Sequence, residues 1–334
     1  MKTIVGSRKH QFIATVSILL IAVALIAVIV VCEEQPPISE IRTWYDLDAI
    51  RDNLGGNYTL INDLDSTTEG YEELASETAN EGKGWQPIGT EEHSFTGIFD
   101  GQSHGIRDLF INRSGEDYVG LFGTVDEAGC IEHMGVVNAT VTGKDHVGGL
   151  VGLCQGTVNN CYFAGNVSGI NGIGGLVGES FGVVSKAYAM GSVTGDYSVV
   201  GGLTGLNGGT VNKSYATANV TGDGELVGGL VGLNDGGAVS DSYAAGSVTG
   251  SSQVGGLVGD NRGVVSGSFW DTQSSGQATS DGGTGKTTFR MKKITTFSGT
   301  GWNIVAVANP STRDPSYTWN IVDYETYPFL SWQM

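Results

Sequence analysis

A four-residue pattern, Gly-Leu-x-Gly, recurs six times between residues 120 and 259 and constrains the fold more than any other feature. The spacings between its leucines are 29, 26, 27, 27 and 27 residues, and these leucines are Leu121, Leu150, Leu176, Leu203, Leu230 and Leu257. A repeat of this length is typical of a stacked array, in which each unit buries its apolar side only against its neighbours. The length of 334 residues therefore does not require two globular domains.

A second segment of each repeat alternates in character and predicts a β-strand. In residues 187–195, for example, Ala187, Ala189 and Val193 share one parity, whereas Tyr188 and Thr194 share the other. The small and apolar set is expected to face inward, with the Tyr, Asn/Ser and Thr/Ser positions facing outward.

The residues just before each leucine break this simple alternation. An apolar residue stands three positions earlier, as Val147 does before Leu150, and so has the opposite parity. Both side chains can face inward only if the glycines between them bend the strand. The pattern therefore predicts a bend at the glycines of every repeat.

The rest of the composition supports a fold without long helices. The chain has 54 glycines but only 6 prolines, and none lies between Pro87 and Pro310. This suits a stack in which every backbone N–H pairs with the next coil. We predict an all-β fold, a β-helix (β-solenoid) with coils of about 27 residues. The regular array is assigned to residues 119–285.

The flanks of the array are interpreted as caps. Residues 43–118 are assigned to an N-terminal cap and irregular first coils, and residues 286–334 to a C-terminal cap. Thr43 is expected to cap a short helix over residues 43–54, with Asp46 completing a capping box.

The N-terminus carries an export signal. Residues 12–31 form an apolar run long enough to span a bilayer, and Lys2, Arg8 and Lys9 precede it. We assign residues 1–32 to a signal or transmembrane helix and residues 33–42 to a linker. Three alternatives remain open: a retained membrane anchor, a cleaved signal peptide, or cleavage followed by lipid attachment to Cys32. All three place residues 33–334 outside the cell.

The tetrads resemble the GLUG-motif repeat family of exported proteins. The resemblance covers about residues 41–334, and its flanking matches include Trp85-Gln86-Pro87-Ile88-Gly89, Phe269-Trp270-Asp271 and Tyr327-Pro328-Phe329-Leu330. It implies a bacterial or archaeal surface protein with β-solenoid segments, often adhesin-like. Similar repeats accompany metallopeptidases that cleave immunoglobulin A, but the sequence shows no counterpart of their zinc domain.

No catalytic motif is recognised in the sequence. Each histidine that could open a His-Glu-x-x-His motif lacks the following Glu, and no phosphate-binding loop or nucleophile elbow is present. We therefore expect no enzymatic activity. The alternative is a carbohydrate-active enzyme, a polysaccharide lyase or glycosidase, on the same scaffold. Lys186, Lys213 and Asp241 occupy equivalent positions in successive repeats, where a local ion-pair ladder is expected.

No cofactor or catalytic metal is expected. Asp63, Asp65 and Asp100 could bind Ca²⁺, although solvated turn carboxylates are the simpler interpretation. The three cysteines beyond Cys32 are expected to be small buried residues, and at least one must be a free thiol. They are Cys130, Cys154 and Cys161.

The outward face of the array offers the candidate ligand contacts. One outward column should stack at about 4.8 Å, and it contains Tyr162, Tyr188, Tyr215, Tyr243 and Phe269. It is either a stabilising aromatic ladder or a contact strip for a glycan or protein. A neighbouring hydroxyl column could order water, as ice-binding solenoids do, and contains Ser168, Thr194, Thr221 and Thr249.

These observations predict an extracellular β-solenoid, anchored to the membrane through residues 12–31, that serves adhesion or surface structure. The expected partner is a glycan or protein on a host, a neighbouring cell or the cell envelope. Nucleic acid is a poor candidate, because 35 acidic against 17 basic residues give a net charge of −18.

Overall fold

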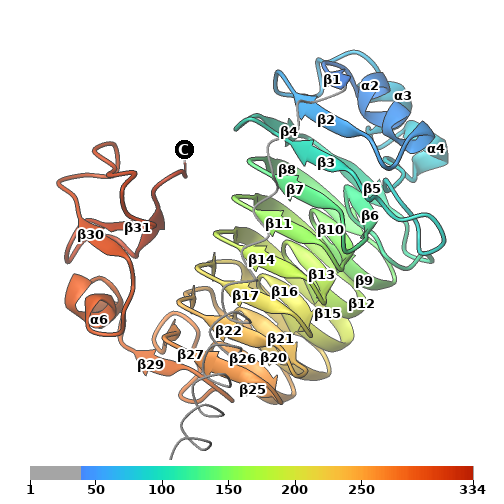
Figure 1. Ribbon diagram of the computed structural model, residues 1–334. Coiled ribbons are helices and arrows are strands. Elements are labelled where there is room, and N and C mark those ends of the chain that lie inside the picture. The colour runs from blue at the N-terminus through green and yellow to red at the C-terminus, as the bar shows by residue number, and fades with distance from the viewer. Residues whose placement is uncertain (1–38, 334) are drawn as a thin grey trace, which may run out of the picture. The chain divides into compact units, whose positions relative to one another are not determined.

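The computed structural model describes residues 39–333 (Figure 1). The predicted N-terminal helix over residues 12–31, and Cys32 with it, lie outside these residues. Among the residues that are described, no helix has the length and apolar character needed to cross a bilayer.

Three parallel sheets form the coils, which confirms the all-β solenoid. The first sheet contains β1 (Ser39–Ile41), β2 (Asn57–Leu60), β3 (Ile98–Asp100), β7 (Cys130–Glu132), β11 (Thr157–Asn159), β14 (Val183–Ser185), β17 (Thr210–Asn212), β22 (Ala238–Ser240) and β27 (Val264–Ser266). The second contains β6 (Phe122–Val125), β10 (Val151–Cys154), β13 (Val177–Ser180), β16 (Thr204–Asn207), β21 (Val231–Asn234) and β26 (Val258–Asn261). Figure 1 shows strands of successive coils lying one above another.

The third sheet is the longest and carries the outward columns. Its strands are β4 (Gly105–Arg107), β5 (Phe110–Asn112), β8 (Gly135–Thr142), β9 (Asp145–Gly148), β12 (Tyr162–Gly174), β15 (Tyr188–Gly201), β18 (Tyr215–Ala216), β19 (Asn219–Gly222), β20 (Glu225–Gly228), β23 (Tyr243–Ala244), β24 (Val248–Thr249), β25 (Ser252–Gly255), β28 (Phe269–Asp271) and β29 (Thr284–Lys286). Equivalent residues pair in register, as Tyr162 does with Tyr188.

Each coil turns where the sequence requires it to. Val147 and Leu150 are both fully buried, because the chain bends at Gly149 and Leu150 between β9 and β10. The predicted glycine bend is confirmed. A Cβ atom on Gly229, the first glycine of its tetrad, would collide with the carbonyl oxygen of Gly256 in the next coil. Close approach of two backbones therefore excludes a larger residue there.

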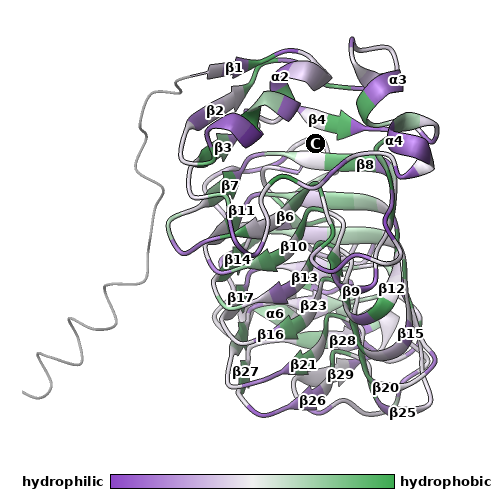
Figure 2. Cartoon of the chain, turned by 90° about the vertical axis from the view of Figure 1, so that its right-hand side faces the viewer, coloured by the Kyte–Doolittle hydropathy of each residue, from purple (hydrophilic) through white to green (hydrophobic). Residues whose placement is uncertain are grey.

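The interior of the stack is apolar and continuous. Figure 2 shows the apolar segments of successive coils lying above one another. Buried polar ladders interrupt it. In one of them, Asn207 Nδ2 donates to Asn234 Oδ1 at 2.7 Å and Asn234 Nδ2 donates to Asn261 Oδ1 at 2.6 Å. Cys154 and Cys161 are buried free thiols, and burial raises the pKa of each to about 12.

Short helices close the N-terminal end of the stack. They are α2 (Trp44–Asp48), the 3₁₀ helix η1 (Ala49–Asp52), α3 (Tyr71–Leu74) and α4 (Ala79–Gly82). The capping box predicted for Thr43 and Asp46 is present. The predicted helix 43–54 is divided into α2 and η1 and ends at Asp52.

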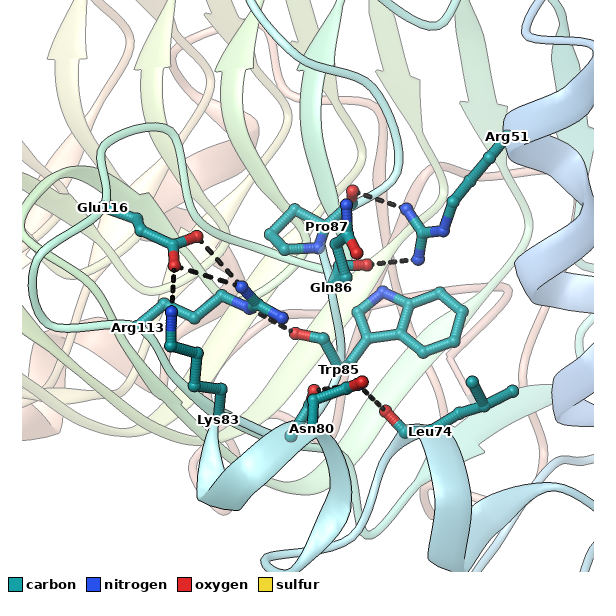
Figure 3. A network of polar contacts seen from close by, with 10 residues as sticks. Arg51, Leu74, Asn80, Lys83, Trp85, Gln86, Pro87, Arg113 and Glu116 are labelled. Carbon is teal, nitrogen blue, oxygen red and sulfur yellow. Dashed lines mark hydrogen bonds and ion pairs between the residues drawn. The ribbon is translucent and has the colours of Figure 1, made fainter.

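Two arginines fasten this end through backbone carbonyls. Arg113 donates to the carbonyl of Trp85 at 2.9 Å and forms two hydrogen bonds to Glu116, whereas Arg51 donates to the carbonyls of Gln86 and Pro87 (Figure 3). The Arg51 guanidinium also lies 4.8 Å from the centroid of the Trp85 ring. We interpret this network as structural, because the guanidinium groups of Arg51 and Arg113 are already paired with carbonyl and carboxylate groups of the protein.

The C-terminal segment packs against the outer face of the third sheet. It contains α5 (Thr288–Met291), α6 (Ile294–Ser298) and a small sheet of β30 (Ile304–Ala306), β31 (Trp319–Ile321) and β32 (Phe329–Leu330). Phe297, Trp302 and Trp319 form a second apolar cluster with the outward tyrosines of the solenoid.

Candidate functional site

The outward aromatic residues form a regular ladder. The ring centroids of Tyr162 and Tyr188 are 4.8 Å apart, and the next two spacings, to Tyr215 and Tyr243, are 4.9 Å each. Phe269 pairs in register with Tyr243. The ladder faces away from the solenoid core, as the alternation of the sequence predicts.

The ladder is not the exposed strip that the sequence suggested. Tyr188, Tyr215 and Phe269 are each 3% exposed and Tyr243 is 1% exposed, because the C-terminal segment covers them. The phenol of Tyr215 donates to Gln333 Oε1 at 2.9 Å, and that of Tyr243 donates to the carbonyl of Pro328 at 2.7 Å. The four covered rings are therefore the core of an intramolecular interface.

Only the N-terminal end of the ladder remains partly open. Tyr162 is half-buried, and its ring fills the space that a side chain at position 135 would occupy above Gly135. Beyond it, a Cβ atom on Gly105 would meet only the carbonyl oxygen of Gly135, at 3.5 Å. The aromatic ladder thus ends at two glycines, Gly135 and Gly105, near the charged side chains of Asp63 and Arg107.

A pocket of about 310 Å³ lies where the solenoid corner meets the C-terminal segment. Asn160 and Lys186 line it from two successive coils, whereas Asn303, Tyr317 and Trp332 line it from the C-terminal segment. The Trp332 ring also contacts the ladder, with its centroid 5.7 Å from that of Tyr188. The pocket therefore combines aromatic rings, amides and one ammonium group, which is a lining suited to a small polar ligand.

Lys186 and its neighbours do not form the ion-pair ladder that we expected. Lys186, Lys213 and Asp241 do lie at the same corner of successive coils, each with positive φ near 49°. However, no ion pair joins them among the described side chains. Burial and the neighbouring charge of Lys213 both lower the pKa of Lys186, and burial raises that of Asp241. Corner backbone geometry, and not charge pairing, explains why these residues align.

The candidate calcium ligands are engaged with protein groups. Asp63 accepts from Gly105 N at 2.9 Å and pairs with Arg107 at 3.1 Å, and these contacts outweigh burial and lower its pKa. Asp65 accepts from Thr67, and Asp100 lies 3.2 Å from His133 Nδ1. Within residues 39–333, no group of three or more His, Cys, Asp or Glu side chains gathers in a metal-binding arrangement.

A second corner of the coil holds a compact His–Glu pair. His146 Nδ1 lies 2.7 Å from Glu179 Oε2, and the Tyr118 ring stacks on the imidazole with centroids 5.0 Å apart. Hydrogen bonding to Glu179 raises the pKa of His146 in spite of partial burial. The two side chains are thus joined by an ion-pair contact at this corner.

The hydroxyl column lies on the same strands but stays open. Thr221 and Thr249 are exposed, whereas Ser168 and Thr194 are half-buried. Part of its hydrogen-bonding capacity is used between neighbouring coils, since the hydroxyl groups of Thr142 and Ser168 lie 2.9 Å apart and form a hydrogen bond. The described side chains of the hydroxyl column therefore give no indication of a particular ligand.

The family model described as the GLUG motif matches residues 223–249. The chain carries the GLUG motif. The matched residues run from before β20 through β24 and supply strands to all three sheets. One GLUG motif is therefore one complete coil, and the six Gly-Leu-x-Gly tetrads mark the stacking of such coils.

Two curated relatives share part of the sequence. Halomucin of Haloquadratum walsbyi is 38% identical over 135 residues, which are 39% of this chain and 1% of halomucin. A protein of Evansella cellulosilytica, provisionally named a Gly-rich membrane protein, is 33% identical over 125 residues, which are 36% of this chain and 14% of that protein. The chain therefore spans only a small part of either relative.

A solved structure shares the fold over most of its length. It is a crystal structure of a Bacteroides ovatus protein, provisionally named an immunoglobulin A1 protease. The TM-score is 0.62, with 88% of this chain and 92% of that chain covered at 21% identity. At this identity the likeness concerns the fold alone.

Sequence reasoning missed the half of the pocket that comes from the C-terminal segment. Asn303, Tyr317 and Trp332 belong to no repeat, so no periodicity marks them. Composition did offer a signal, because nine of the 49 residues from 286 to 334 are aromatic, against 9% in the whole chain. Such a density indicates an aromatic surface that must be buried or must bind.

Proposed function

We propose that this chain is an extracellular β-solenoid, anchored at the cell surface, that binds glycans through the pocket between the solenoid corner and the C-terminal segment. The anchor is the predicted membrane segment 12–31 or a lipid on Cys32. The names of the relatives support a surface location, since one is a mucin by name and the other a membrane protein. Binding, not catalysis, is the proposed activity.

The pocket lining is the observation that carries this proposal. Sugars present apolar ring faces edged by hydroxyl groups, and they are recognised by aromatic rings combined with amide and hydroxyl groups. Tyr317 and Trp332 supply the rings, and Asn160 and Asn303 supply the amides. The volume of about 310 Å³ matches a ligand of one or two sugar residues.

The carbohydrate-active enzyme is the weaker candidate. Hydrolysis requires one carboxyl group that stays protonated near neutral pH and a second that is ionised. Asp63, which lies beside the open end of the ladder with Arg107 and His104, has a lowered pKa and accepts hydrogen bonds from both. A carboxylate held in this way is poorly suited to donate a proton.

A glycan array tests the proposal with the purified full-length chain. We expect binding to a subset of glycans and a loss of at least about ten-fold in affinity for Tyr317→Ala, because a stacking ring is removed. Tyr197→Ala is the matched control, since Tyr197 is 69% exposed and does not line the pocket. Equal binding by the two variants, or no glycan bound by a folded chain, would reject the proposal.

A further inference from the structure

Lys186 and Lys213 differ from the other basic residues of the solenoid in having no acidic partner among the described side chains, and of these two only Lys186 lines the pocket. Lys144 pairs with Asp117 at 3.2 Å and with Asp145 at 3.1 Å, and Arg262 pairs with Asp260 at 2.8 Å. Lys186 forms no ion pair or hydrogen bond with any described side chain. In a chain with twice as many acidic as basic residues, an unpaired cation is unexpected.

The surroundings of Lys186 make the missing partner more costly. The side chain is half-buried, and the like charge of Lys213 stands one coil away. A partly desolvated ammonium group without a counter-ion destabilises the folded state. Among the described residues that line the pocket, Lys186 is the one charged side chain. The fold therefore keeps a positive charge in the pocket at the expense of stability.

Two further atoms of the lining have unused hydrogen-bonding capacity. Asn160 Oδ1 and Trp332 Nε1 are shielded from solvent and have no partner among the described residues. One is an acceptor and the other a donor, and a sugar hydroxyl group can serve either. Because both atoms are shielded from solvent in this structure, each side chain has to turn before a ligand in the pocket can reach it.

The local charge also favours an anion here. Residues 39–285 contain 30 acidic and nine basic residues, whereas residues 286–334 contain five basic and three acidic residues. The pocket lies against the C-terminal segment, which is the part with the basic excess. An acidic ligand therefore meets less repulsion at this junction than elsewhere on the solenoid.

We propose that the pocket binds an acidic sugar residue of a glycan, with the sugar carboxylate paired to the Lys186 ammonium group. The ring of the sugar lies against Tyr317 and Trp332, and its hydroxyl groups bond to Asn160 and Asn303. This inference rests on the proposed glycan-binding function and names the ligand class of the same pocket. Lys186 is the residue that sets the preference for acidic over neutral sugars.

Calorimetry with the full-length chain tests the ligand class. The probes are a glucuronic acid oligosaccharide, its carboxyl-reduced neutral counterpart, and acetate. We expect the acidic oligosaccharide to bind at least about ten-fold more tightly than the neutral one, because a charge-assisted hydrogen bond is lost on reduction. Lys186→Gln should abolish this difference, whereas Lys144→Gln, which removes a charge outside the pocket, should preserve it.

The possible failures can be told apart. Equal binding of the acidic and neutral oligosaccharides, or an unchanged preference in Lys186→Gln, overturns the inference but leaves glycan binding in place. Competition by acetate at the same concentration as the oligosaccharide shows an anion site without sugar recognition, which also overturns it. Absence of binding to any glycan rejects the proposed function itself.

Thermal unfolding without ligand gives an independent readout. Lys186→Met replaces an unpaired cation by an apolar side chain of similar length, so the unfolding midpoint should rise while acidic-glycan binding is lost. A lysine that only supports the fold would show the reverse, a lower midpoint on substitution. That result would overturn the role of Lys186 as a ligand-binding group.

Discussion

The outward face of strands β12 and β15 has two halves that differ in solvent exposure. The first half carries the aromatic ladder, in which Tyr188 is 3% exposed beneath the C-terminal segment. The second half carries the hydroxyl column on the same strands, and it remains accessible to solvent, with Thr221 and Thr249 exposed in the coils beyond. Coil spacing and alternation are the same in both. The repeat thus sets which side chains form a column, and the non-repeating segment decides which column is covered.

The largest expected effect separates the two halves by their contribution to stability. Tyr243→Ala removes a fully buried ring and its hydrogen bond to Pro328, and should lower the free energy of unfolding by about 3–5 kcal/mol. Thr249→Ala, in the open half of the same coil, should change it by less than about 0.5 kcal/mol. Urea denaturation followed by tryptophan fluorescence measures both. Similar losses for the two variants would mean that the halves do not differ.

Alkaline pH should release the covered half first. Burial raises the pKa values of Tyr188, Tyr215 and Tyr243, and burial with the Asp271 carboxylate raises that of Tyr327 to about 12. A pKa raised in the folded state means stability that is present below pH 10 and is lost as pH rises toward 12 and above. Near-ultraviolet circular dichroism should therefore change over this range before far-ultraviolet β-structure does. Simultaneous loss of both signals would contradict independent release of the C-terminal segment.

The ladder itself should show a gradient of stability along its length. Tyr162→Ser affects a half-buried ring and should cost about 1 kcal/mol, whereas Tyr215→Ser affects a buried ring and should cost about 3 kcal/mol. Thermal unfolding of the two single variants measures this difference. Equal costs would show that the C-terminal segment does not determine the energetics of the ladder.

The smallest effect concerns the corner where the open half ends. Val199 has a φ of 60°, which is unfavourable for a β-branched residue, and Gly172 holds the equivalent corner with a φ of 67°. Val199→Gly should relieve this strain and raise stability by up to about 1 kcal/mol. Gly172→Ala is the opposite control and should lower it by a similar amount. Chemical denaturation that shows destabilisation by Val199→Gly would indicate that the packing of the valine outweighs its strain.

The cover also changes how adhesion must be tested. Replacing all four ladder tyrosines by serine would test a contact strip if the four rings were exposed. Since three of them are buried against the C-terminal segment, the substitution would detach that segment. A loss of adhesion would then follow from misfolding. Single substitutions in the pocket, such as Tyr317→Ala, avoid this ambiguity.

The repeating parts of the molecule could be predicted from the sequence, and the non-repeating parts could not. The spacing of the leucines predicted the coil, the parity of Val147 and Leu150 predicted the glycine bend, and the alternation predicted that Tyr188 faces away from the core. Each of these is a local consequence of strand geometry. The position of Trp319 against the ladder depends instead on contacts between residues more than one hundred positions apart, as Tyr215 and Gln333 show.

The candidate site was only half predictable for the same reason. Lys186 was recognised because it recurs with Lys213, but its lack of an acidic partner depends on a corner geometry that the sequence does not display. Asn303, Tyr317 and Trp332 join the site only because the C-terminal segment folds back against the solenoid.

This return path has a consequence for how such a protein can change in length. Three hydrogen bonds join the C-terminal segment to three successive coils. Trp302 donates to the carbonyl of Gly267, Tyr243 donates to the carbonyl of Pro328, and Tyr215 donates to Gln333. The segment therefore fixes the number of coils that it covers. Deleting a coil between Tyr215 and Gly267 would put these three contacts out of register. Coils on the other side of Tyr162 carry no such constraint from these contacts. Gain or loss of whole repeats should therefore be tolerated at the N-terminal end of the array, whereas in the coils covered by the C-terminal segment it should destabilise the fold.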